Sequence, residues 1–198
     1  MFYRILRRCV LIIRPLLVRM KVVGKEKLTR EGGYIITPNH LSALDCVFVA
    51  LACKRTVHYM AKKELFENKL ISWFLKKLQA FSVDRQGADI KAIKHSMTLL
   101  KEQKVLGIFP EGTRATDEKL GAFHQGPAML AIRSQVPIIP VGIYPKFRLF
   151  SKIVLVVGDP VEFSQFREGK ATQEEIAQAT EQLRNITAEL MEQAKAYR

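Results

Sequence analysis

Residues 33–45 read Gly-Tyr-Ile-Ile-Thr-Pro-Asn-His-Leu-Ser-Ala-Leu-Asp, and the interpretation of the whole chain starts from this stretch. Its first part, residues 33–37, is apolar and rich in β-forming side chains. Ser42, followed three positions later by Asp45, is the pattern that begins a helix. The stretch therefore predicts a strand, a short polar loop that carries His40, and then a helix.

The same alternation continues along the chain. Further β-rich runs occur at residues 56–61, 79–84, 104–109, 138–144 and 153–158, and helical stretches occur at 42–53, 64–78, 88–103 and 125–134. This order predicts a single α/β domain with a mostly parallel β-sheet covered by helices. In such a sheet, active groups lie on loops at strand ends. A capping box at Thr172 and Glu175, followed by apolar residues at helical spacing, predicts one long C-terminal helix ending at Tyr197.

Length and composition narrow the class of protein. The chain has 198 residues, which is most simply one domain, and 48% of them are hydrophobic, which excludes a disordered tail. The longest apolar run, Val47 to Cys53, is far shorter than the about 20 residues that a membrane-spanning helix needs. The three cysteines are an odd number without C-x-x-C spacing, so we expect neither a disulfide framework nor a zinc site, and a reducing cytoplasm.

The net charge of +13 is concentrated in residues 1–158 and fits nucleic acid, an anionic membrane or a phosphorylated substrate. On a helix, the arginines of the first twenty residues share one arc and bulky apolar side chains fill the opposite half. We expect residues 1–23 to lie on a membrane surface, with Pro15 kinking or splitting the helix, and residues 24–198 to form the catalytic domain. The alternative is a helix whose apolar side covers the domain core.

His40 and Asp45 are the first pair that could carry chemistry. A carboxylate that accepts the imidazole Nδ1–H leaves Nε2 free to take a proton, which makes a general base. The alternative is that Ser42 and Asp45 only cap a helix. Since no G-x-S-x-G nucleophile pattern is present, the pair would act on a hydroxyl group brought by the substrate.

Residues 109–114, Phe-Pro-Glu-Gly-Thr-Arg, follow another predicted strand. The glycine lets backbone N–H groups approach an anion, and the arginine suits phosphate oxygens, although the same residues also make ordinary turns. Three more segments lie at the ends of predicted strands. Each has a plain structural alternative: an ion pair for Val83-Asp84-Arg85, a core strand for Val136 to Val141, and a solvated helix start for Lys62 and Lys63.

Taken together, Asn39 to Asp45, Val83 to Arg85, Phe109 to Arg114 and Val136 to Val141 resemble the motifs of one family. They match N-H-x4-D, a hydrophobic stretch ending in D-R, F-P-E-G-T-R and V-P-I-I-P-V of the glycerolipid acyltransferases, specifically the 1-acyl-sn-glycerol-3-phosphate acyltransferases. The resemblance covers residues 24–145. His124 departs from it, because relatives usually carry lysine there.

The resemblance implies that His40 is the general base and Asp45 its orienting partner. It implies that the substrate is held by Lys62, Arg85, Glu111, Gly112, Thr113 and Arg114. The implied reaction moves an acyl group from acyl-CoA or an acyl carrier protein to the sn-2 hydroxyl of lysophosphatidate, giving phosphatidate without an acyl-enzyme. No metal and no cofactor besides the acyl donor is expected. The expected location is the cytoplasmic face of the cell membrane, in contact with anionic lipids.

Three other functions remain open at this point. A nucleic-acid-binding protein would also be basic, but no binding motif is recognisable and the cationic arc faces a broad apolar one. A metal-dependent phosphohydrolase could use His and Asp as ligands. Acylation of glycerol 3-phosphate, or of another lysophospholipid, would use the same chemistry as the implied reaction.

Overall fold

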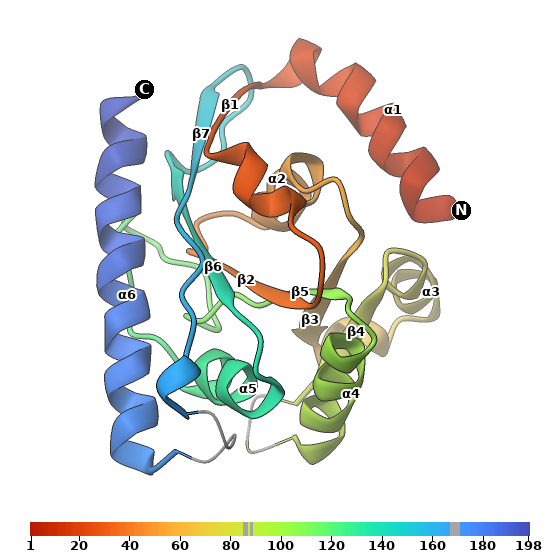
Figure 1. The fold of residues 1–198 in the computed structure, drawn as a ribbon. Coiled ribbons are helices and arrows are strands. Elements are labelled where there is room, and N and C mark those ends of the chain that lie inside the picture. Colours follow the sequence, from red (N-terminus) through yellow and green to blue (C-terminus); the bar gives the residue numbers. More distant parts are fainter. Residues whose placement is uncertain (85–86, 88, 167–170) are drawn as a thin grey trace.

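Seven strands form one sheet in the order β1-β7-β6-β2-β5-β3-β4 (Figure 1). We describe a computed structural model in which residues 1–84, 87, 89–166 and 171–198 are placed. All neighbouring strands are parallel except β6 and β7, which are antiparallel. The strands are β1 (Arg19–Val23), β2 (Tyr34–Pro38), β3 (Val57–Lys62), β4 (Ala80–Val83), β5 (Val105–Gly107), β6 (Ile138–Tyr144) and β7 (Lys152–Val157). The predicted α/β domain with a mostly parallel sheet is confirmed.

Helices cover both faces of the sheet. The α-helices are α1 (Phe2–Leu17), α2 (Asp45–Ala52), α3 (Lys69–Lys77), α4 (Ile90–Lys101), α5 (Gly126–Ser134) and α6 (Gln173–Ala196), and short 3-10 helices are η1 (Lys25–Thr29), η2 (Lys63–Phe66) and η3 (Ser164–Phe166). One core layer packs α2 and η1 against the sheet, and the other packs α4, α5 and the first half of α6. Strand β2 lies between these layers and is buried along its whole length, which explains its unbroken apolar sequence.

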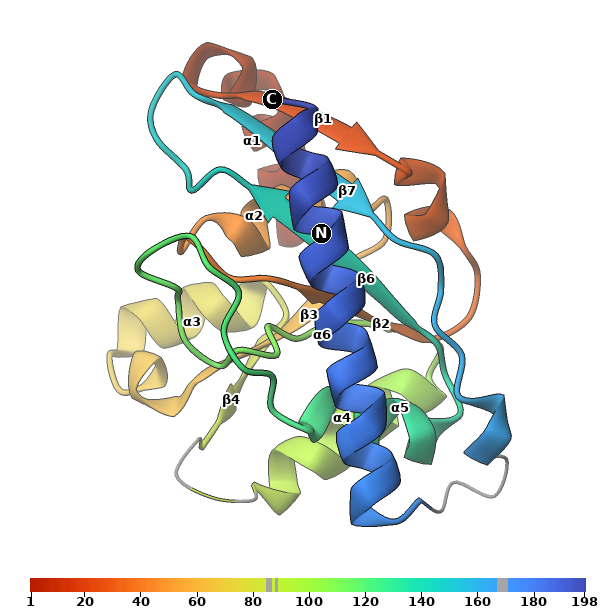
Figure 2. The ribbon, with the colours of Figure 1, turned by 90° about the vertical axis from the view of Figure 1, so that its left-hand side faces the viewer.

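The long C-terminal helix begins as the sequence predicts. The Thr172 N–H donates to Glu175 Oε2 at 2.7 Å, and the Glu175 N–H donates to Thr172 Oγ1 at 3.2 Å, completing the capping box. Figure 2 shows α6 crossing one face of the sheet. Its backbone lies directly on β6 because Gly142 has no side chain, and a Cβ there would come within 2.4 Å of the Leu190 backbone.

The N-terminal segment differs from the sequence-based prediction in two ways. Residues 19–23 are not part of the helix but form β1, an edge strand that pairs with β7, so the sheet begins before the predicted boundary at residue 24. Pro15 does not split α1, which runs from Phe2 to Leu17; its missing N–H deprives a single carbonyl, that of Leu11, of its helical donor. The alternation of Met20, Val22 and their polar neighbours is the strand signal that a helical interpretation obscured.

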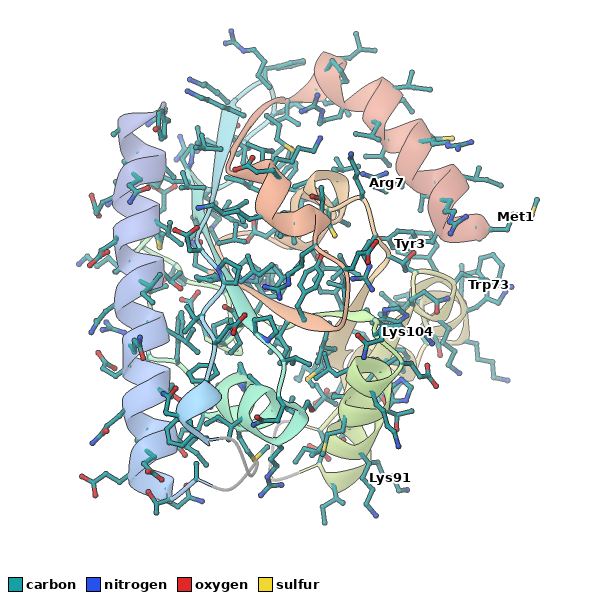
Figure 3. All side chains as sticks on the ribbon, viewed as in Figure 1. Met1, Tyr3, Arg7, Trp73, Lys91 and Lys104 are labelled. Carbon is teal, nitrogen blue, oxygen red and sulfur yellow. The ribbon has the colours of Figure 1, made fainter. Side chains whose placement is uncertain are left out.

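Helix α1 lies along one side of the domain and stays at least partly exposed at every position. Its inner side contacts the domain: Arg7 donates from Nε to the Ala50 carbonyl at 2.9 Å and from Nη2 to the Leu51 carbonyl at 3.0 Å. A guanidinium at these last carbonyls stabilises the C-terminal end of α2. Figure 3 shows Tyr3 and Arg7 reaching from α1 toward the domain. The arginine face and the apolar face of this helix are therefore each partly turned toward the domain: Arg7 of the first and Tyr3 of the second contact it.

Candidate active site

The loops after β2 and β5 meet at the carboxyl edge of the sheet. These strands are neighbours, with Ile36 opposite Gly107, so residues 39–45 and 108–114 leave the sheet side by side. As expected from the sequence, both segments are loops at strand ends. The chemistry-bearing residues come together here because parallel neighbours end at the same edge.

Asn39 fixes the start of the first loop, a role that the sequence analysis did not assign. Its side chain is fully buried, donates from Nδ2 to the Ile143 carbonyl at 3.1 Å, and accepts the Ile143 N–H on Oδ1 at 2.6 Å. The amide thus continues the β2–β6 pairing one step beyond Pro38, which has no N–H to donate. In the sequence, its position directly after an apolar strand and a proline is the signal that could have indicated this structural role.

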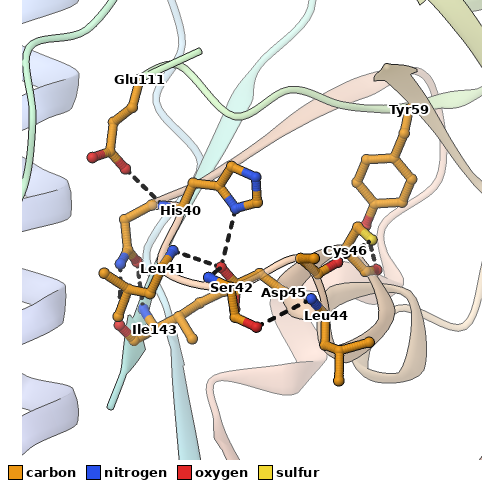
Figure 4. A network of polar contacts seen from close by, with 11 residues as sticks. His40, Leu41, Ser42, Leu44, Asp45, Cys46, Tyr59, Glu111 and Ile143 are labelled. Carbon is orange, nitrogen blue, oxygen red and sulfur yellow. Dashed lines mark hydrogen bonds and ion pairs between the residues drawn. The ribbon is translucent and has the colours of Figure 1, made fainter. Parts of the chain in front are cut away.

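Asp45 holds His40 and its own loop at once (Figure 4). A single carboxylate oxygen, Oδ2, accepts the Leu41 N–H at 2.7 Å and the Ser42 N–H at 2.6 Å, and lies 3.1 Å from His40 Nδ1. Helix α2 begins at Asp45, three residues later than predicted, and Ser42 is not its N-cap residue. The expected helix cap formed by Ser42 and Asp45 is therefore wrong: the buried Asp45 carboxylate caps the loop before the helix and also contacts His40.

An aromatic stack supports the imidazole of His40. The Phe109 ring lies 4.1 Å from it at an interplanar angle of 28°, and Tyr59 continues the stack 6.1 Å from Phe109 at 19°. The Tyr59 hydroxyl donates to the Cys46 carbonyl at 3.0 Å. The ring is thus held at its edge by Asp45 and on its face by Phe109, which leaves Nε2 as the nitrogen available to a substrate.

Cys46 is the thiol beside this pair. Burial, followed by the charge of Asp45, raises the pKa of the Cys46 thiol to about 11. The nucleophilic form of cysteine is the thiolate, so at neutral pH this group is a poor nucleophile.

Glu111 joins the two loops. Its buried carboxylate accepts the His40 N–H on Oε1 at 2.7 Å and the Gly121 N–H on Oε2 at 2.9 Å. Burial raises the pKa of Glu111, and these two hydrogen bonds oppose the shift. The sequence placed Glu111 in the site, and the structure assigns it a positioning contact with the backbone of His40.

The next residues of this motif face solvent. Gly112 adopts a φ of +68°, where a Cβ would also lie 2.8 Å from His124 Nε2. Thr113 and Arg114 are exposed, and Arg114 has no hydrogen bond or ion pair with the part of the chain that the structure describes. The guanidinium of Arg114 is therefore available to contact a ligand.

Of the remaining predicted residues, Lys62 contacts a local partner and not the His40–Asp45 pair. Lys62 ends β3 and pairs with Glu64, 3.1 Å away, at the surface. Its neighbour Lys63 pairs with Asp84, at 2.5 Å, after the end of β4. Arg85 lies outside the described residues.

A hollow of about 380 Å³ opens beside the site. Phe109, Gly112 and His124 line it, together with residues of α4, α5 and the start of α6 that include Ile93 and Ile176. The lining is largely apolar, and Phe109 joins the hollow to the His40 ring.

Two features of the described residues bear on other classes of protein. Within residues 1–84, 87, 89–166 and 171–198, His, Cys, Asp and Glu do not gather in groups of three or more that could hold a metal ion. Over the same residues, the structure has no helix that is both long and apolar enough to cross a membrane.

Comparisons with known proteins show the family of this chain. The family model described as Acyltransferase matches residues 19–144. The chain is 34% identical to the 1-acyl-sn-glycerol-3-phosphate acyltransferase of Bacillus subtilis, over 95% of this chain and 96% of that protein. It is 30% identical to the Streptococcus pneumoniae enzyme of the same name, over 70% of this chain and 54% of that protein.

A solved structure shares the fold. It is the 1-acyl-sn-glycerophosphate (LPA) acyltransferase PlsC from Thermotoga maritima, with a TM-score of 0.71 and 26% identity, covering 90% of this chain and 73% of that one. The range of the family model, residues 19–144, includes the segments that carry His40 and Glu111. The chain belongs to the acyltransferase family, among the 1-acyl-sn-glycerol-3-phosphate acyltransferases.

Proposed function

We propose that this enzyme transfers an acyl group from acyl-CoA or an acyl carrier protein to the sn-2 hydroxyl of 1-acyl-sn-glycerol 3-phosphate. The product is phosphatidate. The observation that carries the proposal is the His40 Nδ1 to Asp45 Oδ2 contact at 3.1 Å, which leaves Nε2 free at the edge of the sheet. The names of the similar enzymes supply the substrate class.

In the proposed mechanism, neutral His40 accepts the proton of the sn-2 hydroxyl at Nε2 while the oxygen attacks the thioester carbonyl. Asp45 stabilises the imidazolium that forms. The tetrahedral intermediate then expels the thiolate, which takes the proton from His40 and leaves as the free thiol. Because the sequence has no G-x-S-x-G nucleophile pattern, we propose direct transfer without an acyl-enzyme. The reaction then needs no metal and no cofactor besides the acyl donor.

The glycerol phosphate would lie beside Gly112, Thr113 and Arg114. A phosphate that loses part of its water needs charged donors, and Arg114 has its guanidinium free for this. Arg85 and Lys62 belong to the proposed phosphate site by resemblance, and Lys62 would then exchange its contact with Glu64 for one with the substrate. The apolar hollow next to Phe109 would hold an acyl chain of one substrate.

We further propose that α1 rests on the anionic surface of the cytoplasmic leaflet. Its outward side combines Ile5, Ile12 and Leu16 with the exposed arginines Arg4 and Arg8. Apolar burial and charge attraction both favour such binding. Replacing Ile12 and Leu16 together by serine should reduce flotation with anionic liposomes, and unchanged flotation would show that α1 is not the anchor.

The test of the reaction is an assay of purified protein with lysophosphatidate in mixed micelles, using each thioester donor separately and resolving the lipid products. We expect phosphatidate and free thiol in equal amounts, and none with His40→Ala. Acylation of glycerol 3-phosphate in place of lysophosphatidate would select the alternative acceptor. Lack of any acyl transfer with either donor would contradict the proposal.

A further inference from the structure

Three segments of the surface expose large apolar side chains. On α1, Ile12 is 76% exposed and Leu16 is 74% exposed. On α3, Leu70 is 75% and Trp73 is 52% exposed. In the connection between β6 and β7, Phe150 is 68% exposed. Single exposed apolar residues are ordinary, but a continuous group of them marks an interaction surface.

The three segments touch one another. The Phe2 ring of α1 lies 5.8 Å from Trp73 and 6.2 Å from Phe74 in edge-to-face contacts. At the other end of the helix, the Phe150 N–H donates to the Leu17 carbonyl at 2.7 Å. Figure 3 shows Trp73 on the surface, close to the end of α1 that carries Met1. Helix α1 therefore contacts both α3 and the β6–β7 connection, and we call the exposed residues of these three segments, Ile12, Leu16, Leu70, Trp73 and Phe150, the docking face.

This docking face borders the catalytic edge of the sheet. Helix α3 follows the carboxyl end of β3 through η2, and residues 145–151 follow the carboxyl end of β6. Both strands run parallel to β2, so these ends lie at the same edge as His40. In Figure 2, α3 and the β6–β7 connection lie on the side that also holds the connection from β5 to α5.

The charge around the docking face favours an anionic bilayer over a second copy of the chain. Helices α1 and α3 contain no acidic residue, while Lys69, Lys76 and Lys77 are exposed on α3. The Lys77 ammonium lies 5.9 Å from the centre of the Trp73 ring. Tryptophan beside lysines is typical of the membrane interface, where the ring sits among headgroups and the ammonium reaches lipid phosphates. Two copies joined through this face would bring like charges together.

We propose that α3 and the β6–β7 connection dock on an anionic bilayer together with α1. Three segments then hold the domain, and the edge that carries His40 faces the lipid surface at a fixed height. The proposal rests on the proposed lipid substrate, and it adds the residues that orient the enzyme on its membrane.

The chain has one tryptophan, Trp73, so the intact protein carries its own reporter at the docking face. Adding phosphatidylcholine vesicles that contain phosphatidylglycerol should shift its emission to shorter wavelength, and brominated lipids should quench it. Unchanged emission from protein that floats with the vesicles would overturn the proposal. Dimeric protein whose emission is already at the shorter wavelength before vesicles are added would also overturn it, because a second copy would then cover the face.

Charge reversal provides a matched pair of variants. Since each basic residue near an anionic surface strengthens binding about 5-fold, Lys76→Glu with Lys77→Glu should weaken vesicle binding by about 30-fold or more. The control, Lys91→Glu with Lys94→Glu, changes the same charge on α4, which Figure 3 shows far from α1. Equal losses in the two variants would mean that only net charge matters and would contradict the docking face.

A matched apolar pair tests the same surface without changing charge. Leu70→Ala on α3 should weaken binding by about 10-fold, as expected for removing apolar atoms that the bilayer buries. Ile90→Ala on α4, also highly exposed, should bind like the wild type. Wild-type binding by Leu70→Ala, together with unchanged Trp73 emission, would exclude α3 from the face.

A short-chain, monomeric lysophosphatidate separates this proposal from the proposed function. We expect the α3 variants to turn it over at the wild-type rate and to lose activity only on vesicle-embedded substrate. Failure of the wild type on the monomeric substrate would contradict the proposed function while leaving the Trp73 result valid. Wild-type activity of the lysine variant on vesicles, with undiminished binding, would contradict the docking proposal alone.

Discussion

The two sides of the catalytic edge are built differently. On the His40 side, Asp45 Oδ2 meets three nitrogen atoms and Glu111 accepts the His40 N–H, and both carboxylates are buried. On the Arg114 side, the side chains face solvent, and the guanidinium has no bonded partner in the described ranges. The first side is already assembled, and in our proposal a ligand completes the second.

This difference separates two contributions to catalysis, the alignment of the general base and the binding of the substrate phosphate. A general base must be aligned before the reaction, because rotation of an unrestrained imidazole would have to be stopped in the transition state. A phosphate-binding arginine instead gains its bonds from the substrate, and its flexibility allows entry. Changes on the His40 side should therefore reduce turnover, and changes on the Arg114 side should reduce affinity.

The largest expected effect comes from removing the base. His40→Ala should lower kcat by a factor at the upper end of about 10²–10⁴, because the sn-2 hydroxyl then loses its proton acceptor. Thermal unfolding should change little, since the carboxylate of Asp45 keeps its two backbone donors. His95→Ala on α4 is the control for an exposed histidine, and a comparable loss there would show that the effect is not specific to the site.

Asp45→Asn should have the next largest effect, with kcat lowered by about 10²-fold, because the imidazole loses the charge that stabilises its protonated form. An amide oxygen can still accept the loop N–H groups, so the fold and the KM values should be nearly unchanged. Steady-state kinetics with circular dichroism measures both. Activity close to wild type would mean that Asp45 acts only as a cap of its loop.

Arg114→Ala tests the open side. A charge-assisted hydrogen bond contributes about 1.5–3 kcal/mol, so its loss should lower the affinity for the acyl acceptor, lysophosphatidate, about 10- to 150-fold. The KM for the thioester donor should hardly change. Arg133→Ala, an exposed arginine on α5, is the matched control. If both substrates suffer equally from Arg114→Ala, the arginine contacts the donor or supports the structure, and the division between the two sides is wrong.

The smallest effect concerns the link between the two loops. Glu111→Gln replaces one acceptor by an amide N–H₂ group that faces a backbone donor, and should lower the free energy of unfolding by about 1–3 kcal/mol. Activity should fall less than in the His40 and Asp45 variants, because Glu111 contacts only the backbone of His40. Denaturant titration of both proteins measures the difference.

The pH dependence of that difference has a defined sign. Burial raises the pKa of Glu111 in the folded protein above its ordinary value of 4.5. A carboxyl group with a raised folded pKa holds its proton more tightly in the folded state. The stability of the wild type relative to Glu111→Gln is therefore greatest below pH 4.5 and decreases as the pH rises through the raised pKa. An increase over that range would show that the hydrogen bonds from His40 and Gly121 outweigh burial.

The sequence predicted the parts of the site whose chemistry is local. The spacing of His40 and Asp45 was enough, because both lie in one loop and need only a short turn to meet. Strand positions were also recognisable, since β2 and β6 are buried on both faces and so read as apolar runs. Both the closeness of His40 to Asp45 and the positions of the strands can therefore be recognised from neighbouring residues alone.

Contacts between distant segments could not be predicted in the same way. The bonds of Asn39 to Ile143 and of Glu111 to His40 depend on strand order, which the sequence does not state. Strand β1 was missed because its short alternating run follows an amphipathic helix and pairs only with β7, far along the chain. Lys62 was placed at a strand end correctly, but its local partner Glu64 was not foreseen.

The pairing of β1 with β7 has a consequence for how the protein is made. Chains are synthesised from the N-terminus, and Arg19 acquires its partner Lys152 only when most of the polypeptide has emerged from the ribosome. Until then nothing secures the base of α1 to the sheet, and its apolar side chains have no finished domain to contact. We expect the nascent helix to reach a nearby membrane before the enzyme folds, so that the catalytic domain assembles where its lipid is found.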